Sequence, residues 1–315
     1  MFALRGLAVS LSVFVMVYCA LSLALSLAWH RVRLWTQTLA ARRAADLLFA
    51  LRMLPLATAA ATTAAFTVPS FLLLEPRAVD EPIGAAPVIL GLFALAAGIA
   101  GIANVVHALR QTSRTVSAWS SGAESLQFPH SLPILRISQP IPPMTAVGIV
   151  HLRILLSSSA QLLLTPAELT MALNHETAHF RHLDNLKKLL LRLVVFPGMR
   201  GLETAWLDAA EMAADDAAVS TSSEALDLAS ALIKLSRLVP AGPTPELSVA
   251  FVHAKGSILN ARVARLISWK CDTQRTTRRL APYGLAAAVA TTAAFVITYS
   301  QLLASAHKAT EWLVR

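Results

Sequence analysis

The residues best suited to chemistry form the segment from His175 to His179, which fits the pattern His-Glu-x-x-His. On a helix, residues four apart lie on one face, so both imidazoles can bind a single Zn²⁺. Glu176 is rotated by about 100° around the helix axis. It can therefore approach a metal-bound water without being a ligand and act there as a general base. The pattern predicts a zinc-dependent hydrolytic site.

A catalytic zinc takes three protein ligands and keeps one position open, so a third ligand must come from elsewhere. Glu211 is the best candidate, because it shares one face of a second predicted helix with Asp215. We expect Glu211 to bind the metal and Asp215 to accept the second N–H of a ligand imidazole. Asp215 and His182 stay open as other third ligands, and Asp184 is a candidate to orient a ligand or contact the substrate. The competing interpretation for these residues is an ordinary solvated helix face.

Helix-start signals and apolar periodicity place the candidate catalytic and metal-binding residues on helices. Thr165 suits an N-cap, Pro166 the first helical position, and Glu168 completes a capping box. This helix should run on through His179. Periodic apolar residues predict further helices over residues 201–220, 225–238 and 256–269.

Short apolar segments in front of the motif predict a small sheet, with strands at residues 134–138, 146–151 and 153–158. Polar residues 111–127 are typical of a linker. The stretch 107–279 is long enough for one domain with its own core. We expect an α+β fold there, and a substrate strand could add to the sheet edge around residues 153–158.

Four windows without charged residues predict transmembrane helices at about residues 6–29, 53–74, 83–106 and 280–306. Each window exceeds the roughly 20 residues that a helix needs to cross the hydrocarbon core. The composition agrees, since 14% of the chain is charged, against roughly 25% in an average soluble domain. We therefore expect a mainly α-helical membrane protein whose residues 307–315 form a short external tail.

The loop charges predict how the spans are oriented. Residues 30–52 carry five arginines and one acid, Asp46, whereas residues 75–82 carry three acids and one arginine. Arginine-rich loops stay in the cytoplasm, so residues 107–279 should also be cytoplasmic in a multi-pass protein of the inner (plasma) membrane. The net charge of +9 is then a topology signal. No basic helix with interleaved aromatic residues supports a nucleic-acid partner.

The motif region, residues 175–186, resembles the active-site helix of the BlaR/MecR-type membrane metallopeptidases, the antirepressor signal transducers of β-lactam resistance. The resemblance also covers residues 153–156, 164–169, 196–197, 211–218 and 257–267. It implies zinc bound by His175, His179 and Glu211, with Glu176 as the base. It further implies a gluzincin-like domain in the cytoplasm between the third and fourth spans.

Sensor members of that family carry an extracellular penicillin-binding domain after the last span, where this sequence has residues 307–315. We therefore expect a signal to arrive through the spans, the loop at residues 75–82, a membrane sensor partner or self-association.

These observations together predict an integral membrane zinc metalloendopeptidase that acts at the cytoplasmic side in signal transduction. Its substrate would be a protein, with a transcriptional repressor, another membrane protein and the chain itself as candidates. The alternative is a metal-binding membrane signalling protein without proteolytic activity.

Overall fold

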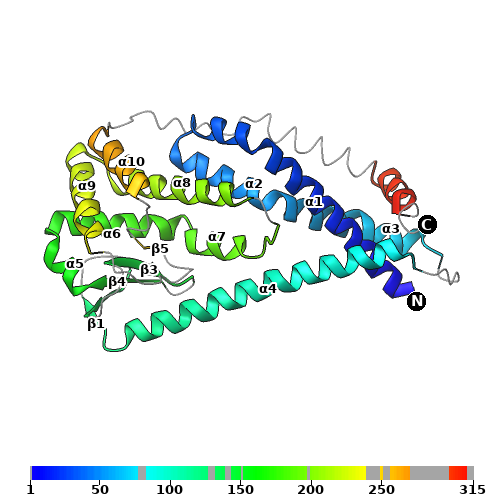
Figure 1. Cartoon of the computed structure of the whole chain (residues 1–315), viewed down its shortest axis with the longest axis horizontal. Coiled ribbons are helices and arrows are strands. Elements are labelled where there is room, and N and C mark those ends of the chain that lie inside the picture. Colours follow the sequence, from blue (N-terminus) through cyan, green and yellow to red (C-terminus); the bar gives the residue numbers. More distant parts are fainter. Residues whose placement is uncertain are drawn as a thin grey trace. The chain divides into compact units, whose positions relative to one another are not determined.

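The computed structural model describes residues 2–76, 83–126, 132–138, 143–149, 152–196, 199–238, 249–250, 256–269 and 298–310. The chain divides into two compact units. The apolar unit contains Met1–Ala28, Met53–Ala100 and Asp272–Arg315, and the sheet unit contains Trp29–Arg52 and Gly101–Cys271. The described part is mostly helical and includes one small mixed sheet (Figure 1).

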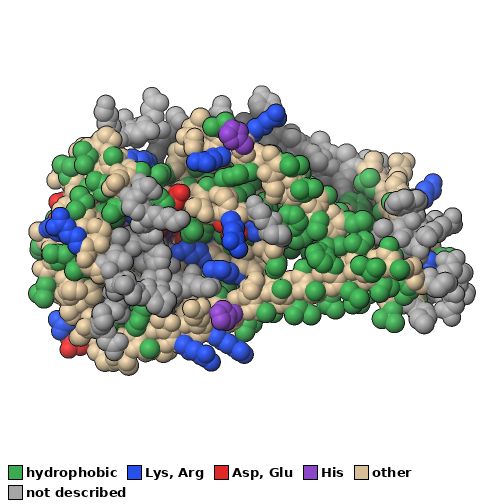
Figure 2. Space-filling view, in the orientation of Figure 1, with side chains coloured by type: hydrophobic (Ala, Val, Ile, Leu, Met, Phe, Trp, Pro, Cys, Tyr) green, Lys and Arg blue, Asp and Glu red, His purple; other side chains and the backbone are tan. Residues whose placement is uncertain are grey.

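Three helices are long and apolar enough to cross a membrane. They are α1 (Phe2–Thr36), the continuous run of α2 (Ala41–Thr62), a π-helical turn (Thr63–Thr67) and α3 (Val68–Leu74), and α4 (Ala85–Ser120). The predicted spans 6–29 and 53–74 fall within these helices, and the span predicted at 83–106 begins two residues before α4. Large hydrophobic side chains such as Leu27, Leu73 and Ile89 are exposed on them, and the visible surface of the apolar unit is mainly green in Figure 2. An apolar exposed surface of this kind suits a lipid environment.

The fourth predicted span lies largely outside the described residues, which resume at residue 298, so the four-span layout stays a prediction. Residues 298–310 are helical and continue past the predicted span end at residue 306. The Tyr299 hydroxyl donates to the carbonyl oxygen of Ala65 at 2.7 Å. Pro69, four residues after Ala65, has no N–H to offer that oxygen. The Tyr299 hydroxyl thus gives the Ala65 carbonyl a hydrogen bond that lipid could not supply.

The sheet has the strand order β1-β2-β4-β3-β5. Strands β2 and β4 are parallel, and the other neighbours are antiparallel. The five strands are β1 (Glu124–Leu126), β2 (Ile134–Ile137), β3 (Met144–Val147), β4 (Arg153–Ser157) and β5 (Val249–Ala250). Strands β2 and β4 confirm the predictions at residues 134–138 and 153–158. Strand β3 shares only residues 146–147 with the strand predicted at 146–151, because it begins and ends earlier, and β1 and β5 are additional.

The expectation that residues 153–158 form a free edge is wrong, because β4 lies between β2 and β3. Its residues Ile154, Leu155 and Leu156 are all fully buried. A run that is apolar on both faces is typical of a central strand.

Each face of the sheet is covered by helices. On one face Met144, Ile154 and Leu156 join the main core, to which α6 (Pro166–Arg181) and α9 (Ser222–Ser236) also contribute. On the other face Leu155 and its neighbours pack against Val116 and Trp119 of α4. Residues 111–120 are therefore helical and not a linker, because these two side chains bury on the sheet. The predicted domain start at residue 107 falls inside α4.

The remaining helices are α5 (Ser158–Leu163), α7 (Asp184–Leu191), α8 (Arg200–Ala218) and α10 (Gly256–Ile267). The capping box predicted at Thr165 is confirmed at the start of α6, and Thr221 forms another at the start of α9. Helix α6 ends in a sharp corner, where Leu183 has a φ of 56°. This corner separates α6 from α7, a helix that periodicity alone did not predict.

Glu168 links α6 to α9 through hydrogen bonds. Its carboxylate accepts hydrogen bonds from the Thr165 backbone N–H at 2.8 Å, the Ser230 hydroxyl at 2.6 Å and the Lys234 ammonium at 2.8 Å. Burial alone would raise the pKa of Glu168, but these three donors lower it to about 2. A charged clamp therefore holds the helix that carries the His-Glu-x-x-His motif.

Replacing Glu168 by Ala should lower the free energy of unfolding by about 2 kcal/mol, because a cap and two further hydrogen bonds are lost together. The matched control is Glu224→Ala, which removes only the capping interactions of α9 and should cost about 1 kcal/mol or less. Denaturant unfolding of the detergent-purified protein measures both. Equal losses of unfolding free energy in the two variants would contradict a role of Glu168 in holding α6 against α9.

The stabilisation that Glu168 contributes depends on pH. Since the pKa of Glu168 is lowered from 4.5 to about 2 in the folded protein, its stabilisation is fully present above about pH 4.5 and disappears as the pH falls towards 2. The stability difference between the wild type and Glu168→Gln should close over this range.

Candidate metal centre

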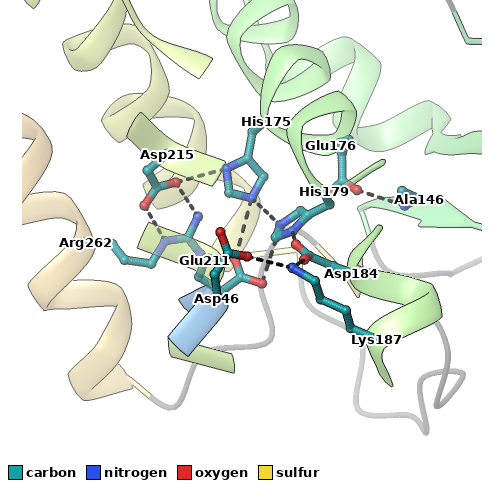
Figure 3. A network of polar contacts seen from close by, with 10 residues as sticks. All are labelled: Asp46, Ala146, His175, Glu176, His179, Asp184, Lys187, Glu211, Asp215 and Arg262. Carbon is teal, nitrogen blue, oxygen red and sulfur yellow. Dashed lines mark hydrogen bonds and ion pairs between the residues drawn. The ribbon is translucent and has the colours of Figure 1, made fainter. Parts of the chain in front are cut away.

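Helix α6 presents His175 and His179 to the interior from successive turns. Their Nε2 atoms lie 3.1 Å apart, and the two side chains are almost completely buried. Figure 3 shows both rings with these atoms turned towards the same small space. The predicted helical spacing of the two histidines is confirmed.

Glu211 of α8 faces this space from the opposite side. Its Oε2 lies 3.5 Å from Nε2 of His175, and its Oε1 lies 3.6 Å from Nε2 of His179. The edge of a tetrahedron around a metal with bonds of about 2.1 Å is about 3.4 Å long. The three side chains together could hold a metal ion.

The other nitrogen of each imidazole faces a carboxylate. Nδ1 of His175 lies 3.0 Å from Asp215 Oδ1, and Nδ1 of His179 lies 2.7 Å from Asp184 Oδ2. Carboxylates in this position select the tautomer that leaves Nε2 free for a metal and also fix the ring orientation. Asp215 and Asp184 thus lie where they can orient the two ligands, while His182 is not in the group that could hold a metal.

A buried arginine neutralises the two acids from α8. Arg262 of α10 is 1% exposed and binds both oxygens of Asp215 at 2.7 and 2.8 Å. Its Nη1 lies 2.9 Å from Glu211 Oε2. Burial alone would raise the pKa of either acid, but Arg262 and the histidines lower that of Glu211 to about 2 and that of Asp215 further. Glu211 therefore carries a negative charge at every physiological pH.

In the metal-free protein these acids also act on His175. Burial would lower the pKa of this imidazole, but the carboxylates of Asp215 and Glu211 raise it to about 9. A metal ion must therefore displace a proton from this ring at neutral pH.

Glu176 points from α6 towards β3. Its Oε2 accepts a hydrogen bond from the Ala146 backbone N–H at 2.9 Å. Its Oε1 is buried and has no hydrogen-bond partner among the described residues. Burial raises the pKa of this carboxyl, although the neighbouring histidines partly offset the effect. An unpaired oxygen on a buried acid beside two imidazoles is well placed to take a proton from a ligand there.

The structure adds residues that sequence reasoning did not assign to the site. Lys187 of α7 lies 3.1 Å from Asp46 of α2 and 3.9 Å from Asp184 (Figure 3). In the sequence, Asp46 is the single acid of the arginine-rich residues 30–52. No pattern in that segment relates it to the His-Glu-x-x-His motif. Arg262 belonged to a predicted amphipathic helix, and only the fold brings it to Asp215.

The donor set fits a metal ion on chemical grounds. It consists of two imidazoles and one carboxylate, and each imidazole is oriented by its own acid. Oε1 of the neighbouring Glu176 lacks a hydrogen bond among the described residues. Buried polar atoms without partners are rare in proteins and often mark a ligand site.

No protein-family model matches this chain, and no curated protein matches it. The case for the site therefore rests on the residues and geometry of this chain, and the resemblance noted in its motifs stays a prediction.

Asp184→Asn should weaken binding of a Co²⁺ probe by roughly 10- to 100-fold, because the carboxylate that orients His179 is lost. Asp216→Asn is the matched control, since Asp216 lies in α8 beside the site but pairs with Arg265. Competition with a chelator measures both affinities, and an unchanged affinity in Asp184→Asn would contradict the orienting role.

Arg262→Met should destabilise the metal-free protein by about 3 kcal/mol, because it leaves two buried carboxylates without their cation. Added Zn²⁺ should recover part of the loss by supplying positive charge beside Glu211. The control Arg265→Met removes an ion pair that is about a third exposed and should cost less than about 1 kcal/mol. Thermal unfolding with and without metal distinguishes the two cases.

Proposed function

We propose that this protein is an integral membrane zinc metalloendopeptidase of the His-Glu-x-x-His type that cleaves a protein at the cytoplasmic side of the membrane. The observation that carries the proposal is the buried group of His175, His179 and Glu211 with the unpaired carboxylate oxygen of Glu176 beside it. A purely structural metal site needs no such base.

The donor set supports zinc as the metal. Two imidazoles and one carboxylate are a common ligand set of catalytic zinc, which leaves the fourth position for water or substrate. Calcium and magnesium prefer sites made of oxygen atoms only.

Zinc held by His175, His179 and Glu211 would polarise a carbonyl group and make a water molecule more acidic. Glu176 Oε1 is placed to take a proton from that water and to pass it to the amine of the cleaved peptide. Asp215 and Asp184 keep the imidazoles in place during this exchange, and Arg262 balances the charge of Glu211.

Strand β3 supports a peptide as the substrate. Ala146 of β3 donates its backbone N–H to Glu176, so a chain paired with this side of β3 lies beside the base. Val249 and Ala250 of β5 occupy this side in an antiparallel register, so a substrate strand would have to take their place. A segment of the chain itself is among the candidate substrates.

The membrane setting agrees with a role in signal transduction. Three helices suit a membrane, and the loop charges favour four spans with the sheet unit in the cytoplasm. The resemblance to BlaR/MecR-type peptidases adds a transcriptional repressor as a candidate substrate and a membrane sensor as a candidate partner.

The decisive experiment uses the full chain in detergent, loaded with Zn²⁺ and incubated with a proteome-derived peptide mixture. The wild type should bind about one zinc and create new peptide N-termini, whereas Glu176→Gln should keep its zinc and create none, because only the base is removed. Mass spectrometry of the N-termini and metal analysis supply the readouts.

Two other outcomes are informative. A wild type that binds zinc but cleaves nothing would favour the inactive metal-binding signalling protein. A wild type that binds no zinc would rule out the metallopeptidase.

A further inference from the structure

Helix α4 continues to Ser120, well past the predicted span end at residue 106, and one side of this extension is buried. Ala108 and Thr112 are almost inaccessible to solvent, and Val116 and Trp119 pack on the sheet. These residues recur at helical spacing, so they form one face of the helix. The packing of the extension against the sheet unit is thereby accounted for.

The opposite face of the extension is basic. His107, Arg110 and Arg114 follow one another at intervals of three and four residues, which places them on one side of the helix, and all three are exposed. None of these side chains has a hydrogen bond or an ion pair with another described residue. The sequence from residue 83 to residue 123 contains no acid. In Figure 2, basic side chains and a histidine gather over this part of α4.

The arginines continue a row that begins with apolar side chains. Every fourth residue of a helix falls on one gently inclined ridge, and in α4 this ridge holds Ile102, Val106, Arg110 and Arg114. Ile102 and Val106 are exposed, and so is Leu109 beside them. The row therefore changes from apolar to basic at the predicted membrane boundary. A phospholipid has the same order, with its acyl chains followed by a charged headgroup.

The spacing along the helix fits the headgroup layer of a bilayer. At about 1.5 Å per residue, Arg110 lies about 6 Å and Arg114 about 12 Å beyond Val106. The headgroup region adds roughly 5 to 7 Å on each side of the hydrocarbon core. Because an arginine can lay its aliphatic stem along an apolar surface and direct its charge towards the interface, both guanidinium groups can reach lipid phosphates.

We propose that this row binds an anionic phospholipid, with the acyl chains against Ile102 and Val106 and the phosphate at Arg110 and Arg114. The loop charges favour the cytoplasmic side for this end of α4, and the cytoplasmic leaflet is the one with a negative surface potential. Positive charge alone would serve as a topology signal, whereas an exposed apolar row that leads into unpaired arginines is a surface for a lipid. The proposal goes beyond the peptidase function and does not depend on the metal centre.

Native mass spectrometry of the full chain in detergent tests the proposal with two added lipids, dioleoyl-phosphatidylglycerol and dioleoyl-phosphatidylcholine. These lipids share their acyl chains and differ in the net charge of the headgroup. The wild type should bind the anionic lipid about tenfold more tightly, since each arginine near an anionic lipid accounts for roughly a fivefold gain in affinity. Combining Arg110→Gln with Arg114→Gln should bring the ratio of the two affinities close to one.

Two further double variants separate this site from a general effect of charge. Arg153→Gln with Arg237→Gln removes the same charge from two other exposed arginines of the sheet unit and should leave the ratio unchanged. Arg110→Lys with Arg114→Lys keeps the charge and should retain most of the preference. Thermal unfolding should be alike in all variants, because all four arginines are exposed and none is paired among the described residues.

Each remaining outcome contradicts a defined part of the proposal. Equal binding of the two lipids by the wild type would overturn it altogether. A ratio that survives the loss of Arg110 and Arg114, or that falls equally in the Arg153 and Arg237 variant, would overturn the assignment to α4. Glycerophosphoglycerol, the headgroup without acyl chains, should not displace the lipid at equal concentration, and full displacement would indicate a site for soluble phosphate esters instead. A failure of the zinc experiment leaves all of these outcomes unaffected.

Discussion

The site depends on holding five ionisable side chains and one arginine together in the protein interior. Burial disfavours every charge in this group, so each acid needs a cation or an imidazole at hydrogen-bonding distance. Arg262 meets this need for Asp215 and Glu211, and Asp184 and Asp215 in turn hold the two histidines. Because each carboxylate pairs with Arg262 or with an imidazole, the loss of one member leaves a buried neighbour without its partner. In this arrangement the Nε2 atoms of His175 and His179 and the carboxylate of Glu211 face one another.

The fold brings the members of this group from distant parts of the chain. Helix α6 is fixed by its capping box and by the bonds of Glu168 to α9, and its buried face rests on the sheet. Helices α8 and α10 then bring Glu211, Asp215 and Arg262 to the histidines. The corner at Leu183 turns the chain so that Asp184 reaches His179. Rigid helices support such a group better than loops would, since small displacements of a ligand weaken metal binding.

Helix α2 connects this group with a membrane-suited segment of the chain. Its first half carries Asp46, which shares Lys187 with Asp184 (Figure 3). It also carries Arg52, which is 2% exposed and bonds to Glu203 of α8 and to the carbonyl of Val194. The segment between the first two apolar windows is therefore part of the sheet unit. The first half of α2 thus belongs to the unit that carries the candidate metal centre, and its second half belongs to the apolar unit.

The sequence by itself determined the features that depend on near neighbours. The spacing of His175 and His179, the cap at Thr165 and the apolar windows up to residue 106 are properties of short segments, and helical periodicity and hydropathy report them directly. Only the tertiary structure decided which strand is central, that residues 111–120 are helical, and that Arg262 and Asp46 belong near the histidines. These features arise from contacts between residues far apart in the chain, and no local pattern encodes the partner of a buried charge.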